Sequence, residues 1–129
     1  MKYYTTTLEV EHEDLDALNH VNNVRYVQWV QDVAGAHWNS MATSEMKKRY
    51  FWVVIRHTVD YKSPAQLHDF INVRTFVEKS EGATSTRIVE MFNSETDKLI
   101  MRAETIWCLI SRRSKRPVRI TDEIVKLFN

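Results

Sequence analysis

A crowded polar segment, Asp14 to Asn23, runs without a break into an apolar helical pattern, and this junction constrains the fold more than any other part of the chain. The segment carries carboxylate, carboxamide and imidazole side chains side by side. Beyond it, apolar residues from Tyr26 to Trp38 leave only a narrow polar edge on the predicted helix. A helix with that distribution is covered on most of its circumference. The sequence therefore predicts a long buried helix whose N-terminus adjoins a polar loop.

Strands are predicted on both sides of this helix. Residues 3–11 alternate in polarity as a half-buried strand does, and residues 12–23 form a loop. After the long helix, Thr43 or Ser44 caps a short helix, and Phe51 to Tyr61 forms a strand that Lys62-Ser63-Pro64-Ala65 ends. Three further strands follow, at roughly 69–79, 85–92 and 99–111, with turns at Gly82 and 93–97, and Thr121 caps a final helix.

Sequential strands with one segregated long helix indicate an α+β fold, an antiparallel sheet with the helix packed on one face. We expect a single domain over residues 1–129. Gly35 lies inside the long helix, where glycine costs about 1 kcal/mol relative to alanine. Its position predicts the close approach of a neighbouring backbone.

Charge and cysteine content exclude several classes of protein. The 18 basic and 17 acidic side chains give a net charge of +1, which argues against nucleic-acid and anionic-membrane partners. Cys108 is the single cysteine, so no internal disulfide or multi-cysteine zinc site is expected. No signal peptide or membrane span is recognised, and a cytoplasmic protein is expected.

The sequence motifs of several common metal-binding, catalytic and nucleotide-binding sites are absent. The five histidines show no metal-ligand spacing, and Asp14-x-Asp16 lacks the glycine and the bidentate glutamate of a calcium loop, so no metal is expected. Serine-hydrolase elbows, phosphate loops and dinucleotide fingerprints are also missing.

The polar segment admits two interpretations. A carboxylate just before a helix shares its space with free backbone N–H groups, which are donors for a developing oxyanion. Alternatively, Asp14, Asp16 or Asn22 simply caps the helix. A basic cluster, Arg112, Arg113, Lys115, Arg116 and Arg119, either holds the phosphates of a substrate such as coenzyme A or forms a solvated turn.

The run from Asp14 to Tyr26 resembles the Asp-x-x-(Gly/Asn)-His-Val-Asn-Asn-x-x-Tyr signature of hotdog-fold acyl-CoA thioesterases of the 4-hydroxybenzoyl-CoA thioesterase type. It is also similar to the corresponding stretch of plant acyl-ACP thioesterases. Residues 59–65, 102–107 and 112–117 resemble the same family. The resemblance implies a hotdog fold, in which a five-stranded antiparallel sheet wraps around the long central helix. It also implies a homodimer or homotetramer with active sites at the subunit interface.

The resemblance assigns roles residue by residue. Asp16 matches the catalytic carboxylate, acting as general base or nucleophile, and the backbone N–H of Asn23 matches the donor that polarises the thioester carbonyl. His20 belongs to the signature, with a role that differs among relatives. Asn19 stands where glycine is usual and tolerates left-handed backbone, while Leu18 replaces the asparagine of the plant pattern.

The leading hypothesis is hydrolysis of an acyl-CoA or acyl-carrier thioester to free acid and thiol. No cofactor is expected beyond the coenzyme A of the substrate. We expect Asn19, Tyr26, Arg112, Arg113 and Arg116 to contact the substrate, although an apolar stripe at helical spacing is more often plain core. The alternative is a non-catalytic acyl-thioester or lipid-binding module; a dehydratase lacks its usual catalytic pattern on the helix. The acyl group and its carrier are not readable from these residues.

Overall fold

A computed structural model describes residues 1–129 and shows one sheet of five strands. The strands are β1 (Tyr4–Glu9), β2 (Tyr50–Tyr61), β3 (Phe70–Glu81), β4 (Thr84–Asn93) and β5 (Leu99–Ser111). Their spatial order is β1-β3-β4-β5-β2, and every neighbouring pair is antiparallel. The predicted five-stranded antiparallel sheet is therefore confirmed, and β1 and β2 form its two edges.

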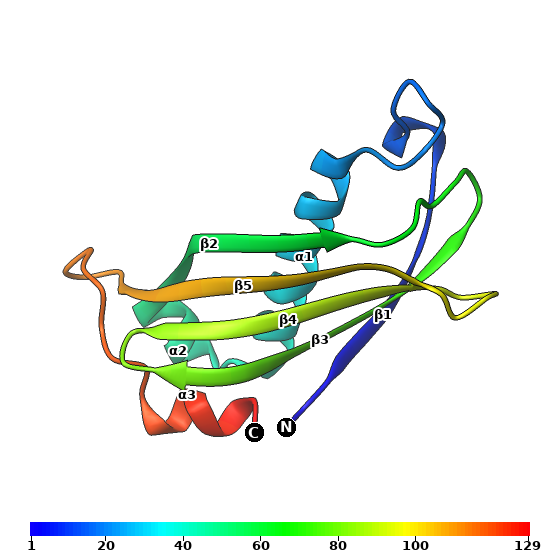
Figure 1. Cartoon of the computed structure of the whole chain (residues 1–129). Coiled ribbons are helices and arrows are strands. Elements are labelled where there is room, and N and C mark those ends of the chain that lie inside the picture. Colours follow the sequence, from blue (N-terminus) through cyan, green and yellow to red (C-terminus); the bar gives the residue numbers. More distant parts are fainter.

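The long helix α1 (Asn23–Met41) packs across one face of the sheet (Figure 1). Its buried residues recur at helical spacing, and Tyr26, Trp29, Val30 and Val33 enter the same core cluster as inward-facing residues of the sheet. The predicted apolar band is wider than the face buried in one chain. Val27 and Ala36, for example, belong to the predicted band and are only partly buried.

The shorter elements follow their predicted caps. Helix α2 (Ser44–Arg49) begins after Thr43, whose Oγ1 accepts a hydrogen bond from the Met46 N–H at 3.1 Å. Helix α3 (Asp122–Leu127) begins after Thr121, whose Oγ1 accepts from the Ile124 N–H at 3.2 Å. A short 3₁₀ turn, η1 (His12–Asp14), precedes the polar loop. No helix combines the length and the apolar character that crossing a membrane requires.

Two hydrophobic clusters fill the space between helix and sheet. The larger one, of 14 residues, includes the first half of α1 and the middle strands. The smaller one, of 6 residues, includes Met46 of α2, Ile124 of α3 and Phe128. Figure 1 shows α2 and α3 together at one end of the sheet, opposite the loop that leads into α1. The molecule thus has two chemically different ends joined by one helix.

The interpretation of Gly35 is wrong. A Cβ placed on this residue meets no atom within 4 Å, so no neighbouring backbone approaches it. The space beside Gly35 is instead a cavity lined by side chains. Glycine here leaves that space open.

Candidate active site

The polar loop is a compact turn held by its own backbone. Leu15 and Val21 pair as an antiparallel bridge, and the Asp16 N–H donates to the His20 carbonyl at 2.7 Å. Asn19 closes the turn with a φ of 63°, and its N–H donates to the Asp16 carbonyl at 3.1 Å. The expectation that Asn19 occupies a left-handed position is confirmed, since asparagine is among the few residues that adopt it readily.

Asp16 lies half-buried at the base of this turn. Its Oδ1 accepts hydrogen bonds from the N–H groups of Leu18 at 2.8 Å and His20 at 3.1 Å. No group of the chain donates to Oδ2. The turn therefore fixes the orientation of the carboxylate through one oxygen and leaves the other free to accept a proton or attack a carbon.

Asp14 has the opposite environment. It is buried, at 3% exposure, and both of its oxygens are occupied. Oδ1 accepts from Arg25 Nε at 2.6 Å, and Oδ2 accepts from the Glu11 N–H at 2.8 Å. The Asp14 carbonyl also accepts the Asn22 N–H at 2.9 Å. Asp14 therefore ties the loop to the first turn of α1.

The start of α1 presents one unused donor. Asn22 is the N-cap, and its Oδ1 accepts from the Val24 N–H at 3.0 Å. The capping interpretation thus holds for Asn22. Asn23 is the first helical residue, and its own N–H makes no hydrogen bond within the chain. A free donor at a helix N-terminus suits a developing negative charge on oxygen.

Two aromatic candidates lie near this junction. His20 is half-buried, its backbone pairs with Gln66, and its ring makes no hydrogen bond within the chain. Tyr26 is 3% exposed and packs against Trp29 and Tyr61, each with a centroid separation of 5.8 Å. Burial raises the pKa of Tyr26 to about 12, so its hydroxyl stays protonated at neutral pH. Within one chain the Tyr26 ring belongs to the core.

The structure does not bring the basic turn to this loop. Arg112, Arg113 and Arg116 follow β5 at the end of the sheet where α2 lies, and the Arg112 Nε donates to the Lys47 carbonyl at 3.0 Å. Arg113 and Arg116 are exposed. The cavity that Arg112 lines includes Asn39, which lies about 24 Å from Asn23 along the axis of α1. The predicted substrate contacts therefore divide between two ends of one chain.

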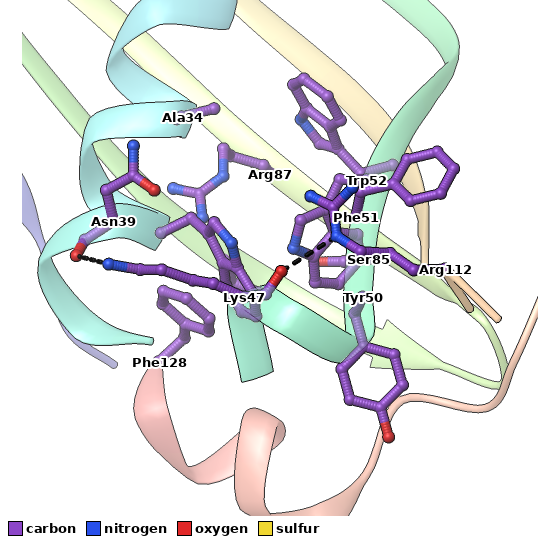
Figure 2. Close-up of a pocket in the computed structure, with 14 residues that line it drawn as sticks. Ala34, Asn39, Lys47, Tyr50, Phe51, Trp52, Ser85, Arg87, Arg112 and Phe128 are labelled. Atoms are coloured by element: carbon purple, nitrogen blue, oxygen red, sulfur yellow. Dashed lines mark hydrogen bonds between the residues drawn. The ribbon is translucent and has the colours of Figure 1, made fainter. Parts of the chain in front are cut away.

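Sequence reasoning missed that cavity, whose volume is about 320 Å³. It lies between the second half of α1 and the sheet, and Figure 2 shows its walls. Arg87 of β4 lines it and is only 5% exposed. The signal was present in the sequence, because Arg87 shares its strand face with Val89 and Met91, both fully buried. No group of three or more potential metal ligands gathers anywhere in the chain.

Comparison with known proteins identifies the fold and the family. Residues 1–128 match the profile of the acyl-ACP thioesterase N-terminal domain. The chloroplastic palmitoyl-acyl carrier protein thioesterase of Gossypium hirsutum is 32% identical over 84 residues, which are 64% of this chain and 20% of that enzyme's length. The chain therefore spans only a small part of this relative.

A second relative is matched almost end to end. The acyl-CoA thioester hydrolase YbgC of Escherichia coli is 24% identical over 94% of this chain and 92% of its own length. Among solved structures, a 1,4-dihydroxy-2-naphthoyl-CoA thioesterase from Synechocystis has a TM-score of 0.84 at 15% identity, covering 98% of this chain and 95% of its own. This structural likeness confirms the hotdog fold.

Proposed function

The chain belongs to the acyl-ACP thioesterase family, and on that premise we propose that it hydrolyses an acyl thioester of coenzyme A or acyl carrier protein to the free acid and the thiol. The observation that carries the proposal is the pairing of two unused groups at one junction. Asp16 has a free Oδ2, and Asn23, at the start of α1, has a free N–H. Relatives named as thioesterases for acyl carrier protein and for acyl-CoA support both carriers equally.

In the proposed reaction the Asn23 N–H donates to the carbonyl oxygen of the thioester. This donor stabilises the negative charge that develops when the carbonyl carbon becomes tetrahedral. Asp16 Oδ2 either takes a proton from the attacking water or attacks the carbon itself. In both cases the C–S bond breaks, and the thiolate leaves and takes up a proton. When Asp16 activates water, that water supplies the hydroxyl of the acid directly; when Asp16 attacks, a mixed anhydride forms, and water then cleaves it to release the acid and restore the Asp16 carboxylate.

We propose that a second copy of the chain completes the site. Strand β2 is a free sheet edge of 12 residues, long enough to pair with another strand. Val53, Ile55 and Tyr61 on this strand are 39%, 58% and 44% exposed. A homodimer, or a homotetramer built from it, would cover them. The exposed Arg113 and Arg116 then serve as phosphate contacts from a neighbouring subunit, because within one chain they lie too far from Asp16.

The test is release of free thiol from a panel of acyl-CoAs of different chain length and from acyl carrier protein thioesters. Wild-type protein, Asp16→Asn and a matched control, Asp32→Asn, are compared. Asp32 is an exposed aspartate of α1 bonded only to Gln28. We expect turnover by wild type and by the control, and loss of turnover in Asp16→Asn.

Two results would contradict the proposal. Full activity of Asp16→Asn would remove Asp16 from the mechanism. Tight binding of a non-hydrolysable acyl-CoA analogue with no turnover on any substrate would instead support the non-catalytic module.

A further inference from the structure

The cavity at the second end of α1 is a built pocket. Its volume of about 320 Å³ is within the range of small-molecule sites. It is walled by α1, α2, the first residues of β2, the middle strands and Phe128. Six aromatic side chains line it: Trp38, Tyr50, Phe51, Trp52, Trp107 and Phe128.

Arg87 is a buried cation without an anion. Its Nη1 is 2.9 Å from His37 Nδ1 and donates to Thr75 Oγ1 at 3.1 Å. Those contacts use two of the five N–H donors of a guanidinium. Nε and Nη2 have no acceptor in the chain, and the ion pairs of the protein involve only Arg25, Arg74 and Arg102.

The guanidinium is nevertheless charged. Burial lowers the pKa of Arg87 to about 10, still well above neutral pH. Burial and the positive charge of Arg87 lower the pKa of His37 to about 4, so the imidazole beside it is neutral. An unpaired buried charge is costly, and buried charges in proteins are normally paired. The missing counter-charge at Arg87 is therefore one that a ligand can supply.

The rest of the lining has the same polarity. Lys47 and Arg112 also line the cavity, and no aspartate or glutamate does. In Figure 2 the Lys47 and Arg112 side chains lie beside the cavity, linked by hydrogen bonds to Asn39 and to the Lys47 carbonyl. The indole N–H of Trp107 is buried without a partner. The walls thus offer positive charge and hydrogen-bond donors within an aromatic surface.

We propose that this cavity binds a small amphipathic carboxylate, with the carboxylate on the free N–H groups of Arg87 and the apolar body against the aromatic walls. A carboxylate matches the planar fork of a guanidinium. Gly35 contributes by leaving room for the apolar body. The inference does not depend on the proposed hydrolysis, because it rests on residues at the other end of α1.

The direct test is calorimetric titration of purified protein with octanoate and with 4-phenylbutanoate, each compared with its neutral primary amide. The two acids carry the same carboxylate on an aliphatic and an aromatic body, so their affinities show which kind of apolar body the cavity prefers. Charge-assisted hydrogen bonds contribute about 1.5–3 kcal/mol, so at least one acid should bind roughly tenfold to a hundredfold tighter than its amide. Three of the four tryptophans line the cavity, so intrinsic fluorescence reports the same titration.

Two variants separate the contribution of the Arg87 charge to binding from that of the cavity volume. Arg87→Met should weaken acid binding by about tenfold or more and leave amide binding unchanged. Gly35→Leu keeps Arg87 but fills the cavity, and should weaken binding of acid and amide alike. Arg119→Met, an exposed arginine outside the lining, is the matched control and should bind as wild type does.

The proposal fails if neither acid binds, or if acids and amides bind equally to wild type. It also fails if folded Arg87→Met retains wild-type affinity for the acids. Should Arg87→Met not fold, the comparison of acid with amide and the Gly35→Leu variant still decide. Loss of thiol release in Asp16→Asn has no bearing on any of these outcomes.

Discussion

The buried charges at the two ends of α1 differ in whether the chain supplies a counter-charge. At the N-terminal end, the buried carboxylate of Asp14 is neutralised by Arg25 and by a backbone N–H, so the chain satisfies it completely. At the other end, the buried guanidinium of Arg87 contacts only neutral groups, the side chains of His37, Thr75 and Phe128, and no carboxylate. Breaking a compensated buried pair destabilises a fold, and an uncompensated buried charge is costly. This cost is the reason for the counter-charge from a ligand that we propose at Arg87.

Asp16 lies between these extremes. One of its oxygens is held by two N–H groups, and the other is free. This arrangement suits a reacting carboxylate, because the loop holds one oxygen in place and leaves the other without a hydrogen bond. The comparison therefore separates the structural role of Asp14 from the roles proposed for Asp16 in hydrolysis and for Arg87 in ligand binding.

The largest effect on stability is expected for Asp14→Ala. This change leaves the partly buried Glu11 N–H and the Arg25 guanidinium without their acceptor, and should lower the free energy of unfolding by about 1–3 kcal/mol. Chemical denaturation measures it. Glu13→Ala, an exposed neighbour in the same 3₁₀ turn, should change stability by less than about 0.5 kcal/mol. Equal effects in the two variants would remove the structural role of Asp14.

A second effect on stability, spread over the acid range of pH, is expected from the titration of His37. Its pKa is about 4 in the folded chain and 6.5 as the ordinary value, so the folded state disfavours the protonated form. The stability linked to His37 is complete above pH 6.5 and is lost as the pH falls toward 4. The slope is at most about 1.4 kcal/mol per pH unit for one proton.

Melting temperatures of wild type and His37→Gln between pH 7.5 and about 4.5 give this difference. The variant should lose less stability on acidification than wild type. Parallel curves for the two proteins would show that His37 is not the neutral partner of Arg87.

The smallest effect is expected for Gly35→Ala. Its Cβ meets no atom within 4 Å, so the variant should gain up to about 1 kcal/mol of helix stability. Gly82→Ala is the contrasting change, because Gly82 has a φ of +61° and alanine is strained there. Destabilisation by Gly35→Ala would mean that the cavity beside it is already filled by the protein.

The same contrast explains what the sequence could predict. The turn at Asn19, the caps Thr43 and Thr121 and the strand positions depend on residues close together in the chain. The turn and the caps are confirmed, and the strands lie where predicted, with ends that differ by up to two residues, as in β1 (Tyr4–Glu9). The cavity depends on where distant elements meet. Its charge was visible only as Arg87 on an apolar strand face, and Gly35 was interpreted as a packing contact because local pattern does not distinguish a close neighbour from an empty space.

The basic turn shows that residues adjacent in sequence need not share one environment in the fold. Arg112, Arg113 and Arg116 are adjacent in sequence and were predicted to act together. All three arginines are exposed, but the Arg112 guanidinium lies over the Phe51 ring at 5.2 Å and bonds to the Lys47 carbonyl, whereas the side chains of Arg113 and Arg116 make no hydrogen bond within the chain. Their separation follows from contacts with α2 and β2, which the turn's own sequence does not contain.

The central claim is that the chemistry belongs to Asp16 at the N-terminal end of α1. Its most direct test is the rate of thiol release at saturating acyl-CoA by wild type and Asp16→Asn, with circular dichroism to verify that the variant is folded. The amide keeps an oxygen for the Leu18 and His20 N–H groups but is no base or carboxylate nucleophile. We predict a fall of about 10²–10⁴-fold. A folded variant with the wild-type rate would contradict the claim.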